Sequence, residues 1–132
     1  MKLIEENRAR LGFQCRIITK LDQTAFDRIL VDAPCSNTGV MRRRVDLRWR
    51  IQSVEIERLK ATQLDLLRQA QKCIKPRGTI VYSTCSLEPE ENGDVVRQFL
   101  TENPGVLLEA ERTLLPFNDK VDGAYVARLR FP

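Results

Sequence analysis

The sequence predicts an α/β fold built around a parallel, doubly wound β-sheet. Two short apolar runs, Phe26–Asp32 (FDRILVD) and Thr79–Ser83 (TIVYS), are typical of strands buried on both faces. Between them, from about Ser53 to Ile74, apolar residues recur at three- and four-residue steps, as in an amphipathic helix. This alternation of strands and helices favours a parallel sheet, in which ligands bind beyond the carboxyl ends of the strands.

The segments before and after this central unit follow the same pattern. Leu3–Leu11 predicts a short helix closed by Gly12, a residue that suits a left-handed cap. Cys15–Thr19 (CRIIT) predicts a strand. Pro76 and Gly78 should end the long helix, because neither residue favours a helix interior.

The last third of the chain predicts one more helix and a hairpin. Proline suits the first position of a helix and two glutamates follow it, so a helix should open at Pro89 and end at Asn103. Val106–Glu109 and Ala124–Phe131 read as strands, with an antiparallel pairing expected at this final hairpin.

Composition limits the class of protein. The 132 residues allow one domain, residues 1–132, and 42% hydrophobic with 30% charged residues is ordinary for a soluble globular chain. No apolar run approaches the roughly 18 residues that span a bilayer, and the amino terminus lacks the apolar stretch of an export signal. A cytoplasmic location is therefore expected.

The chain contains no histidine and four cysteines, which excludes several kinds of site. Ser-His-Asp triads, Cys-His pairs and zinc sites with imidazole ligands are all ruled out. The absence of a CxxC pair argues against a zinc ribbon or a thioredoxin-type site, so the cysteines are expected to be thiols. A phosphatase loop needs arginine at the sixth position after cysteine, and Met41 stands there after Cys35.

Two segments carry cysteines directly after predicted strands. They are Asp32–Gly39 (DAPCSNTG) and Ser83–Asn92 (STCSLEPEEN). Together they resemble the two signature motifs of the NOL1/NOP2/Sun family of RNA (cytosine-5)-methyltransferases. The resemblance extends to Met41–Arg50 (MRRRVDLRWR) and to Val121–Tyr125 (VDGAY), and it is strongest with bacterial members that modify 16S ribosomal RNA.

This resemblance implies a reaction and a role for each motif residue. The reaction is transfer of a methyl group from S-adenosylmethionine (SAM) to carbon 5 of cytosine in RNA, with 16S ribosomal RNA as the expected partner. Cys85 would attack carbon 6 as the nucleophile, and Cys35 would assist proton removal and product release. Asp32 would orient the cytosine or the cofactor, although an aspartate there could also be a helix or turn cap. Pro34 and, near the adenine, Asp22 would contact the cofactor.

The remaining candidates are basic and aromatic. Net charge is +4, and Met41–Arg50 concentrates five arginines against one aspartate. Such a run is often only a solvated face, but its place after the first cysteine motif favours phosphate contacts. Trp49 could stack on a base or pack in the core. The expected RNA-binding residues are Arg42, Arg43, Arg44, Arg48 and Arg50.

The sequence departs from the family pattern before the first motif. A complete domain has a strand, a glycine-rich loop, a helix and a second strand that hold SAM, whereas Gly12 stands alone before Gly39 here. The expected fold is thus the carboxyl-terminal portion of a Rossmann-like SAM-dependent methyltransferase, without its first two strands. The isolated chain should be a deficient enzyme, and the alternative is an incompetent fragment or stand-alone module that at most binds RNA.

Two further expectations concern packing. The edge of Phe26–Asp32 should be exposed and apolar, so either Cys15–Thr19 pairs with it or two chains associate there as a homo-oligomer. Cys15 and Cys73 are interpreted as packing residues rather than catalytic ones.

Overall fold

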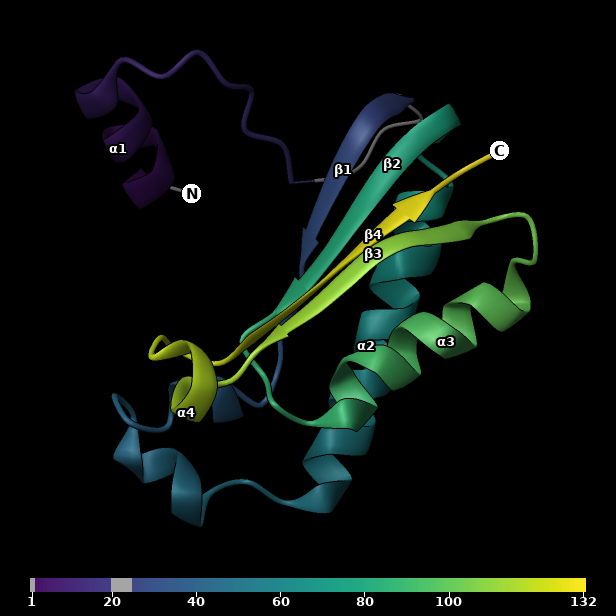
Figure 1. The fold of residues 1–132 in the computed structure, drawn as a ribbon. Coiled ribbons are helices and arrows are strands. Elements are labelled where there is room, and N and C mark those ends of the chain that lie inside the picture. Colours follow the sequence, from purple (N-terminus) through teal and green to yellow (C-terminus); the bar gives the residue numbers. More distant parts are fainter. Residues whose placement is uncertain (1, 20–24) are drawn as a thin grey trace.

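The computed structural model describes residues 2–19 and 25–132 and contains one four-stranded sheet in the order β1-β2-β4-β3 (Figure 1). The first pair, β1 and β2, is parallel, whereas β4 runs antiparallel to both β2 and β3. The predicted parallel pair and the antiparallel hairpin are therefore both confirmed. The strands are β1 Phe26–Asp32, β2 Ile74–Thr84, β3 Leu107–Leu114 and β4 Ala124–Arg130.

Among the described residues, four α-helices accompany the sheet: α1 Lys2–Leu11, α2 Ser53–Gln71, α3 Gly93–Glu102 and α4 Pro116–Asp119. The same part of the chain has three short 3₁₀ helices in its loops: η1 Thr38–Val40, η2 Val45–Trp49 and η3 Pro89–Glu91. The helix expected at Pro89 starts as a 3₁₀ turn and becomes α-helical only at Gly93. No helix in the described ranges has both the length and the apolar character needed to cross a membrane.

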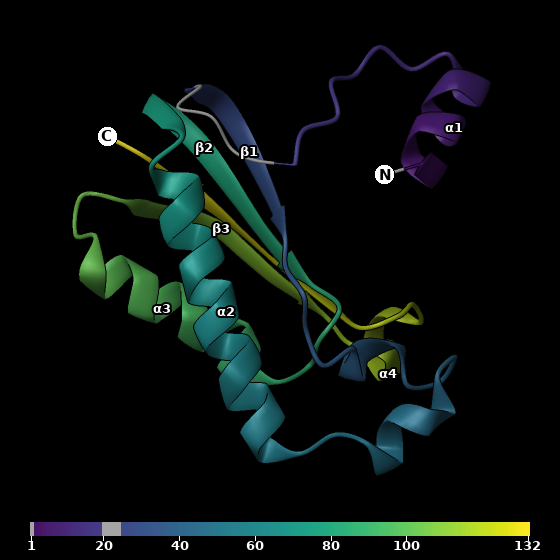
Figure 2. The same ribbon diagram turned by 180° about the vertical axis from the view of Figure 1, so that it is seen from behind.

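Helices α2 and α3 pack against the same face of the sheet (Figures 1 and 2). Alternate residues of the two central strands point into this layer, because successive side chains of a strand face opposite sides. Ile80, Tyr82 and Leu129 from the strands are fully buried there against Leu67 of α2 and Phe99 of α3. This face of the sheet carries the hydrophobic core.

The other face and the β1 edge remain open. Leu30, in the middle of β1, is 67% exposed, so the prediction that this strand is buried on both faces is wrong. Ile29 and Cys73 line an apolar groove of about 280 Å³ between β1 and α2. Cys73 itself is buried, which confirms its assignment to packing. Helix α1 buries none of its side chains and stands apart from the sheet in both views.

The segment Cys15–Thr19 is not a strand, so the prediction that it pairs with β1 is wrong. A segment with strand propensity forms a strand only when a neighbouring strand can hydrogen-bond to it. In the described part of the chain β1 pairs only with β2. The expectation that Cys15 is a packing residue is also wrong, because this thiol is exposed. Association of two chains through the β1 edge stays a prediction.

Strand β2 starts earlier than the sequence predicts. Its regular part does begin at Thr79, which pairs with Arg28, but irregular pairing extends back to Ile74. Pro76 and Gly78 lie inside this irregular stretch, next to Arg77 with a positive φ of 60°. The carbonyl of Pro132 accepts a hydrogen bond from Arg77 N at 2.8 Å, so the carboxyl terminus stabilises this stretch.

Core packing predicts how single truncations affect stability. Leu67→Ala should lower the free energy of unfolding by about 2–5 kcal/mol, because Leu67 is 0% exposed and the cavity cannot refill. Leu30→Ala, the same truncation at an open site, should change it by less than about 0.5 kcal/mol. Urea unfolding followed by circular dichroism measures both values. Equal losses in the two variants would contradict this placement of the core.

Candidate active site

The two motif cysteines meet at one edge of the sheet. Cys35 follows β1 and Cys85 follows β2, and parallel neighbours end on the same side. Their sulfur atoms lie 3.3 Å apart, although the residues are 50 positions apart in the sequence. Both are half-buried free thiols. The structure therefore brings together the residues that the sequence predicts as nucleophile and assistant.

Backbone contacts hold the two cysteine loops against each other and against the final hairpin. The carbonyl of Cys85 accepts from Gly39 N at 3.0 Å, and the carbonyl of Gly39 accepts from Gly123 N at 2.8 Å. A Cβ atom on Gly39 would lie 2.2 Å from the Gly123 oxygen and 2.8 Å from the Cys85 oxygen. The close approach of three segments therefore requires glycine at position 39.

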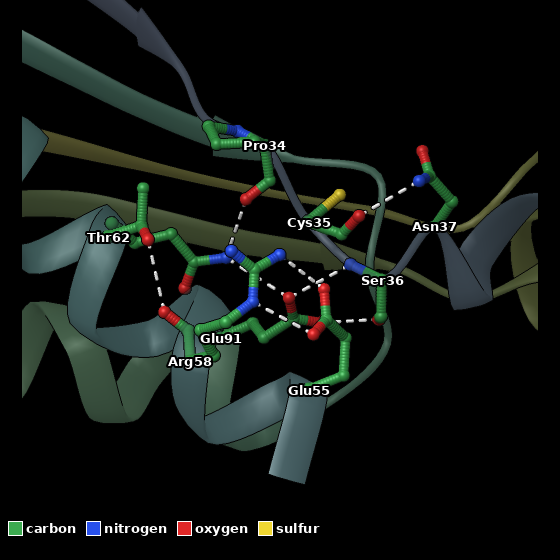
Figure 3. Close-up of polar contacts among 9 residues, drawn as sticks. Pro34, Cys35, Ser36, Asn37, Glu55, Arg58, Thr62 and Glu91 are labelled. Atoms are coloured by element: carbon green, nitrogen blue, oxygen red, sulfur yellow. Dashed lines mark hydrogen bonds and ion pairs between the residues drawn. The ribbon is translucent and has the colours of Figure 1, made fainter. Parts of the chain in front are cut away.

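Asn37 links the backbone of Cys35 to the thiol of Cys85, a role that sequence reasoning did not assign. It has a φ of 61°, a left-handed backbone conformation that asparagine tolerates better than most residues. Its amide nitrogen donates to the carbonyl of Cys35 at 2.8 Å (Figure 3). The Cys85 thiol donates to the amide oxygen of Asn37 at 2.9 Å. Asn37 thereby fixes the direction of the Cys85 S–H bond.

The surroundings of Cys35 favour its neutral form. The pKa of this thiol is raised to about 12, chiefly because burial disfavours the thiolate; backbone hydrogen bonds lower it and the nearby Cys85 raises it by smaller amounts. At neutral pH Cys35 therefore keeps its proton. A neutral thiol at 3.3 Å can donate to the sulfur of Cys85, and such a bond stabilises that sulfur when it is charged.

A buried carboxyl group lies directly behind the two thiols. Glu91, in η3, is 0% exposed, and its Oε1 accepts from Ser36 N at 2.9 Å and from Gln63 Nε2 at 3.1 Å. Its Oε2 accepts from the hydroxyl of Ser36 (Figure 3). The same oxygen accepts from the hydroxyl of Ser86 at 2.5 Å. Sequence reasoning placed Glu91 only in the first turn of a helix, because none of these partners is near it in a helical pattern.

Further hydrogen bonds connect the residues of this region. Gln63 Nε2 of α2 also donates to the carbonyl of Pro34 at 2.9 Å. Thr84 donates to Asn92 Oδ1 at 2.6 Å, and Asn92 Nδ2 donates to the carbonyl of Ser86 at 2.9 Å. Pro34, predicted to contact a cofactor, therefore presents its carbonyl to α2.

Asp32 lies at the carboxyl end of β1 and is exposed. Its carboxylate accepts from the Ser83 hydroxyl of β2 at 3.1 Å, so it bridges strands and caps no helix or turn in the described chain. Asp32, Cys85 and Tyr125 line a hollow of about 340 Å³. Asp22, the other predicted acidic contact, lies outside the described residues.

A second hollow contains Cys35 but not Cys85. It has a volume of about 470 Å³ and is lined by Cys35, Arg44 and Arg50 over the apolar side chains Leu47 and Leu59. The structure thus divides the predicted site residues. Cys85 and Asp32 share one hollow, while Cys35 and two of the arginines share the other.

The arginine-rich segment is partly neutralised. Asp122 forms ion pairs with Arg42 at 2.5 Å and with Arg43 at 2.9 Å, which ties the segment to the final hairpin. Arg50 lies 3.5 Å from Asp46. Within the described ranges, no ion pair engages Arg44 or Arg48. Trp49 is 87% exposed, so packing in the core is wrong for this side chain.

A family model described as 16S rRNA methyltransferase RsmB/F matches residues 1–130. The chain belongs to this family. Among curated relatives, ribosomal RNA small subunit methyltransferase B of Pasteurella multocida is 38% identical over 153 residues, which cover 98% of this chain and 34% of that protein. The protein of the same name from Vibrio vulnificus is also 38% identical, over 143 residues. The chain spans about a third of the length of these relatives.

Solved structures give the same assignment. NSun6 from Pyrococcus horikoshii, solved with SFG, superposes with a TM-score of 0.82 at 27% identity, over 98% of this chain and 38% of that one. A methyltransferase homolog protein from the same organism gives a TM-score of 0.81 at 28% identity, over 99% of this chain and 50% of that one. The family resemblance and the fold class predicted from the sequence are therefore confirmed.

The raised pKa of Cys35 predicts slow alkylation. Iodoacetamide reacts with thiolates, so Cys35 should be modified much more slowly than exposed Cys15 in the same chain near pH 8. The Cys35 rate should still rise about tenfold per pH unit above about pH 9, where an ordinary thiol levels off. Peptide mass spectrometry at timed intervals measures both rates. A plateau for Cys35 near pH 9 would contradict a neutral, buried thiol.

Proposed function

We propose that this chain supplies the catalytic thiols of an RNA (cytosine-5)-methyltransferase that acts on ribosomal RNA. The observation that supports the proposal most is the pair of sulfur atoms 3.3 Å apart at the carboxyl ends of two parallel strands, beside Asp32. One thiol can act as a nucleophile and a second one beside it can handle a proton, which is what substitution at carbon 5 of cytosine requires.

The proposed reaction begins at Cys85. Its thiolate forms a bond from sulfur to carbon 6 of cytosine, and the displaced electron pair makes carbon 5 nucleophilic. After carbon 5 has accepted the methyl group, its hydrogen is transferred as a proton to a water molecule, with assistance from the neutral Cys35 thiol. The electron pair of that C–H bond restores the double bond between carbons 5 and 6, and the bond to Cys85 breaks.

The described residues fit one end of a SAM site. Asp32 and Cys85 both line the hollow of about 340 Å³, so a cationic donor and the nucleophile would share it. Bound there, SAM would supply an electrophilic methyl group. Asp32 would hold the donor or the cytosine edge, and the structure of NSun6 with SFG supports a cofactor of this class.

RNA is the proposed partner of the arginine-rich segment. Arg44 and Arg50 line the hollow that contains Cys35, so phosphates near the target nucleotide could be bound there. The names of the curated relatives support ribosomal RNA as the substrate.

A second candidate is a module that binds RNA without transferring a methyl group. The chain contains no glycine-rich loop and spans about a third of its curated relatives, which favours deficient methyl transfer by the 132 residues alone. The two candidates share the RNA contacts and differ in whether Cys85 reacts.

Covalent trapping tests the roles of the cysteines. RNA containing 5-azacytosine should form an adduct with the chain, and Cys85→Ala should abolish it because the nucleophile is removed. Cys35→Ala should let the covalent complex accumulate, since release of the base is impaired. The adducts are measured by denaturing gel electrophoresis with labelled RNA. Cys15→Ala removes an exposed thiol that lines neither hollow of the candidate site and serves as the control. Equal yields from all variants would contradict both roles.

Salt dependence tests the phosphate contacts. Arg44→Ala should reduce the slope of log affinity against log salt by about 0.7 for a single-stranded contact or about 0.9 for a duplex contact. Fluorescence anisotropy with labelled RNA at several salt concentrations measures this slope. Arg97→Ala removes an equally charged side chain on α3 as the control, and an unchanged slope for Arg44→Ala would leave Arg44 as surface charge.

A further inference from the structure

The side chain of Glu91 is fully buried near the thiol pair, and the proposed reaction does not use its carboxyl group. Its two oxygens accept four hydrogen bonds, and three of the donors belong to Ser36 and Ser86. These serines directly follow Cys35 and Cys85 in the sequence. The carboxyl group therefore contacts both cysteine loops one residue beyond each thiol.

The remaining contacts of Glu91 attach this junction to the core. Gln63 Nε2 bridges the carboxyl group, at 3.1 Å, and the Pro34 carbonyl, at 2.9 Å. The buried Tyr82 hydroxyl donates to the backbone carbonyl of Glu91 at 2.6 Å. The position of Glu91 is thus fixed by helix α2 and strand β2 together, and Ser36 takes its position from Glu91.

A buried carboxyl group is costly to desolvate unless hydrogen bonds compensate for the lost water. In the described chain Glu91 has no cationic side chain as a partner, and both of its oxygens are occupied by donors from the cysteine loops and Gln63. No hydrogen bond joins it to either sulfur. These contacts suit a group that sets geometry and do not suit a base that takes a proton from substrate.

We infer that Glu91 is a positioning residue that holds the Cys35 and Cys85 loops in register, so that the two thiols stay within reach of one substrate base. The inference rests on the proposed function only for the roles of the two thiols. In this inference Glu91 positions the loops through the geometry of its hydrogen bonds and not through its negative charge.

Glutamine can reproduce this geometry. In Glu91→Gln the amide oxygen can accept from Ser36 N and Gln63, and the amide NH₂ can donate to the hydroxyls of Ser36 and Ser86, which also accept hydrogen bonds. Glu91→Ala removes all of these bonds. A positioning role therefore predicts rescue by glutamine, whereas a role for the negative charge predicts that glutamine fails as alanine does.

The distance between the thiols can be tested without RNA or cofactor. Diamide takes two electrons and two protons from the thiols, so a Cys35–Cys85 disulfide forms and diamide is reduced to the hydrazine. In a Cys15→Ala background, mass spectrometry measures the rate of disulfide formation at timed quenching. Glu91→Ala should slow it by about tenfold or more, because small displacements strongly reduce the effective concentration of two groups. Glu91→Gln should retain the rate of the parent protein.

Two more variants complete the test. Ser36→Ala removes one bond to Glu91 and should slow the reaction in the same direction, which keeps the test valid if Glu91→Ala fails to fold by circular dichroism. Glu88→Gln changes a nearby glutamate whose side chain is not in the cluster, and it should have no effect. An unchanged rate in Glu91→Ala, a glutamine variant as slow as alanine, or an equal loss in Glu88→Gln would each overturn the inference.

The same variants separate this inference from the proposed function. If the parent chain forms no adduct with 5-azacytosine RNA but the disulfide rates follow the expected order, the positioning role stands and the proposed reaction fails. If adducts form in the parent chain and in Glu91→Ala alike, while the disulfide rates are also equal, the positioning role fails and the proposed reaction stands.

Discussion

Parallel strands end at the same edge of a sheet, and the site depends on this property of the β1–β2 pair. The register that pairs Asp32 with Ser83 also sets how far each loop must travel before Cys35 and Cys85 meet. Asp32 and Ser83 are the last residue pair of the two strands, so hydrogen bonds between strands do not align the loops that follow. The loops are aligned instead by the close backbone approach at Gly39 and by the buried carboxyl group of Glu91.

The residues around the thiols show how a polar cluster can be stable inside an apolar core. Helix α2 contributes apolar side chains such as Leu67 to the core and also Gln63, which is fully buried and hydrogen-bonded to Glu91. A buried polar group without partners is strongly destabilising, but one with several donors can specify a single arrangement. Helix α2 thus connects the core to the cysteine loops through the hydrogen bond from Gln63 to Glu91.

The sequence predicts best those elements that depend on local pattern. The bounds of β1 and the start of α2 follow from apolar runs and helical periodicity, and they agree with the structure. The segment Cys15–Thr19 has a strand-like composition but no partner, so propensity alone gives a wrong prediction. Strand β3 extends to Leu114, well past the predicted Glu109, because pairing with β4 rather than burial maintains it.

In the candidate site, too, the sequence predicts some residues and misses others. The family motifs identify Cys35, Cys85 and Asp32, because those residue types stand at the ends of recognisable strands. The links through Asn37 and Glu91 span 48 and 55 positions and carry no periodic signal. Only tertiary structure brings such partners together.

The two thiols line different hollows. Cys85 and Asp32 face the hollow near the uncovered side of the sheet, while Cys35 faces the one bordered by Arg44. In the proposed reaction, the nucleophile Cys85 and the methyl donor must both reach the same cytosine, which they can do from one hollow. The RNA phosphates must lie near cationic side chains that can contact them. The burial that keeps Cys35 neutral is consistent with this division, because a neutral thiol beside Cys85 can stabilise the attacking sulfur without competing for the base. The site thus keeps two tasks apart: the Asp32 carboxylate shares a hollow with Cys85, and the arginines that would contact phosphate share the other hollow with Cys35.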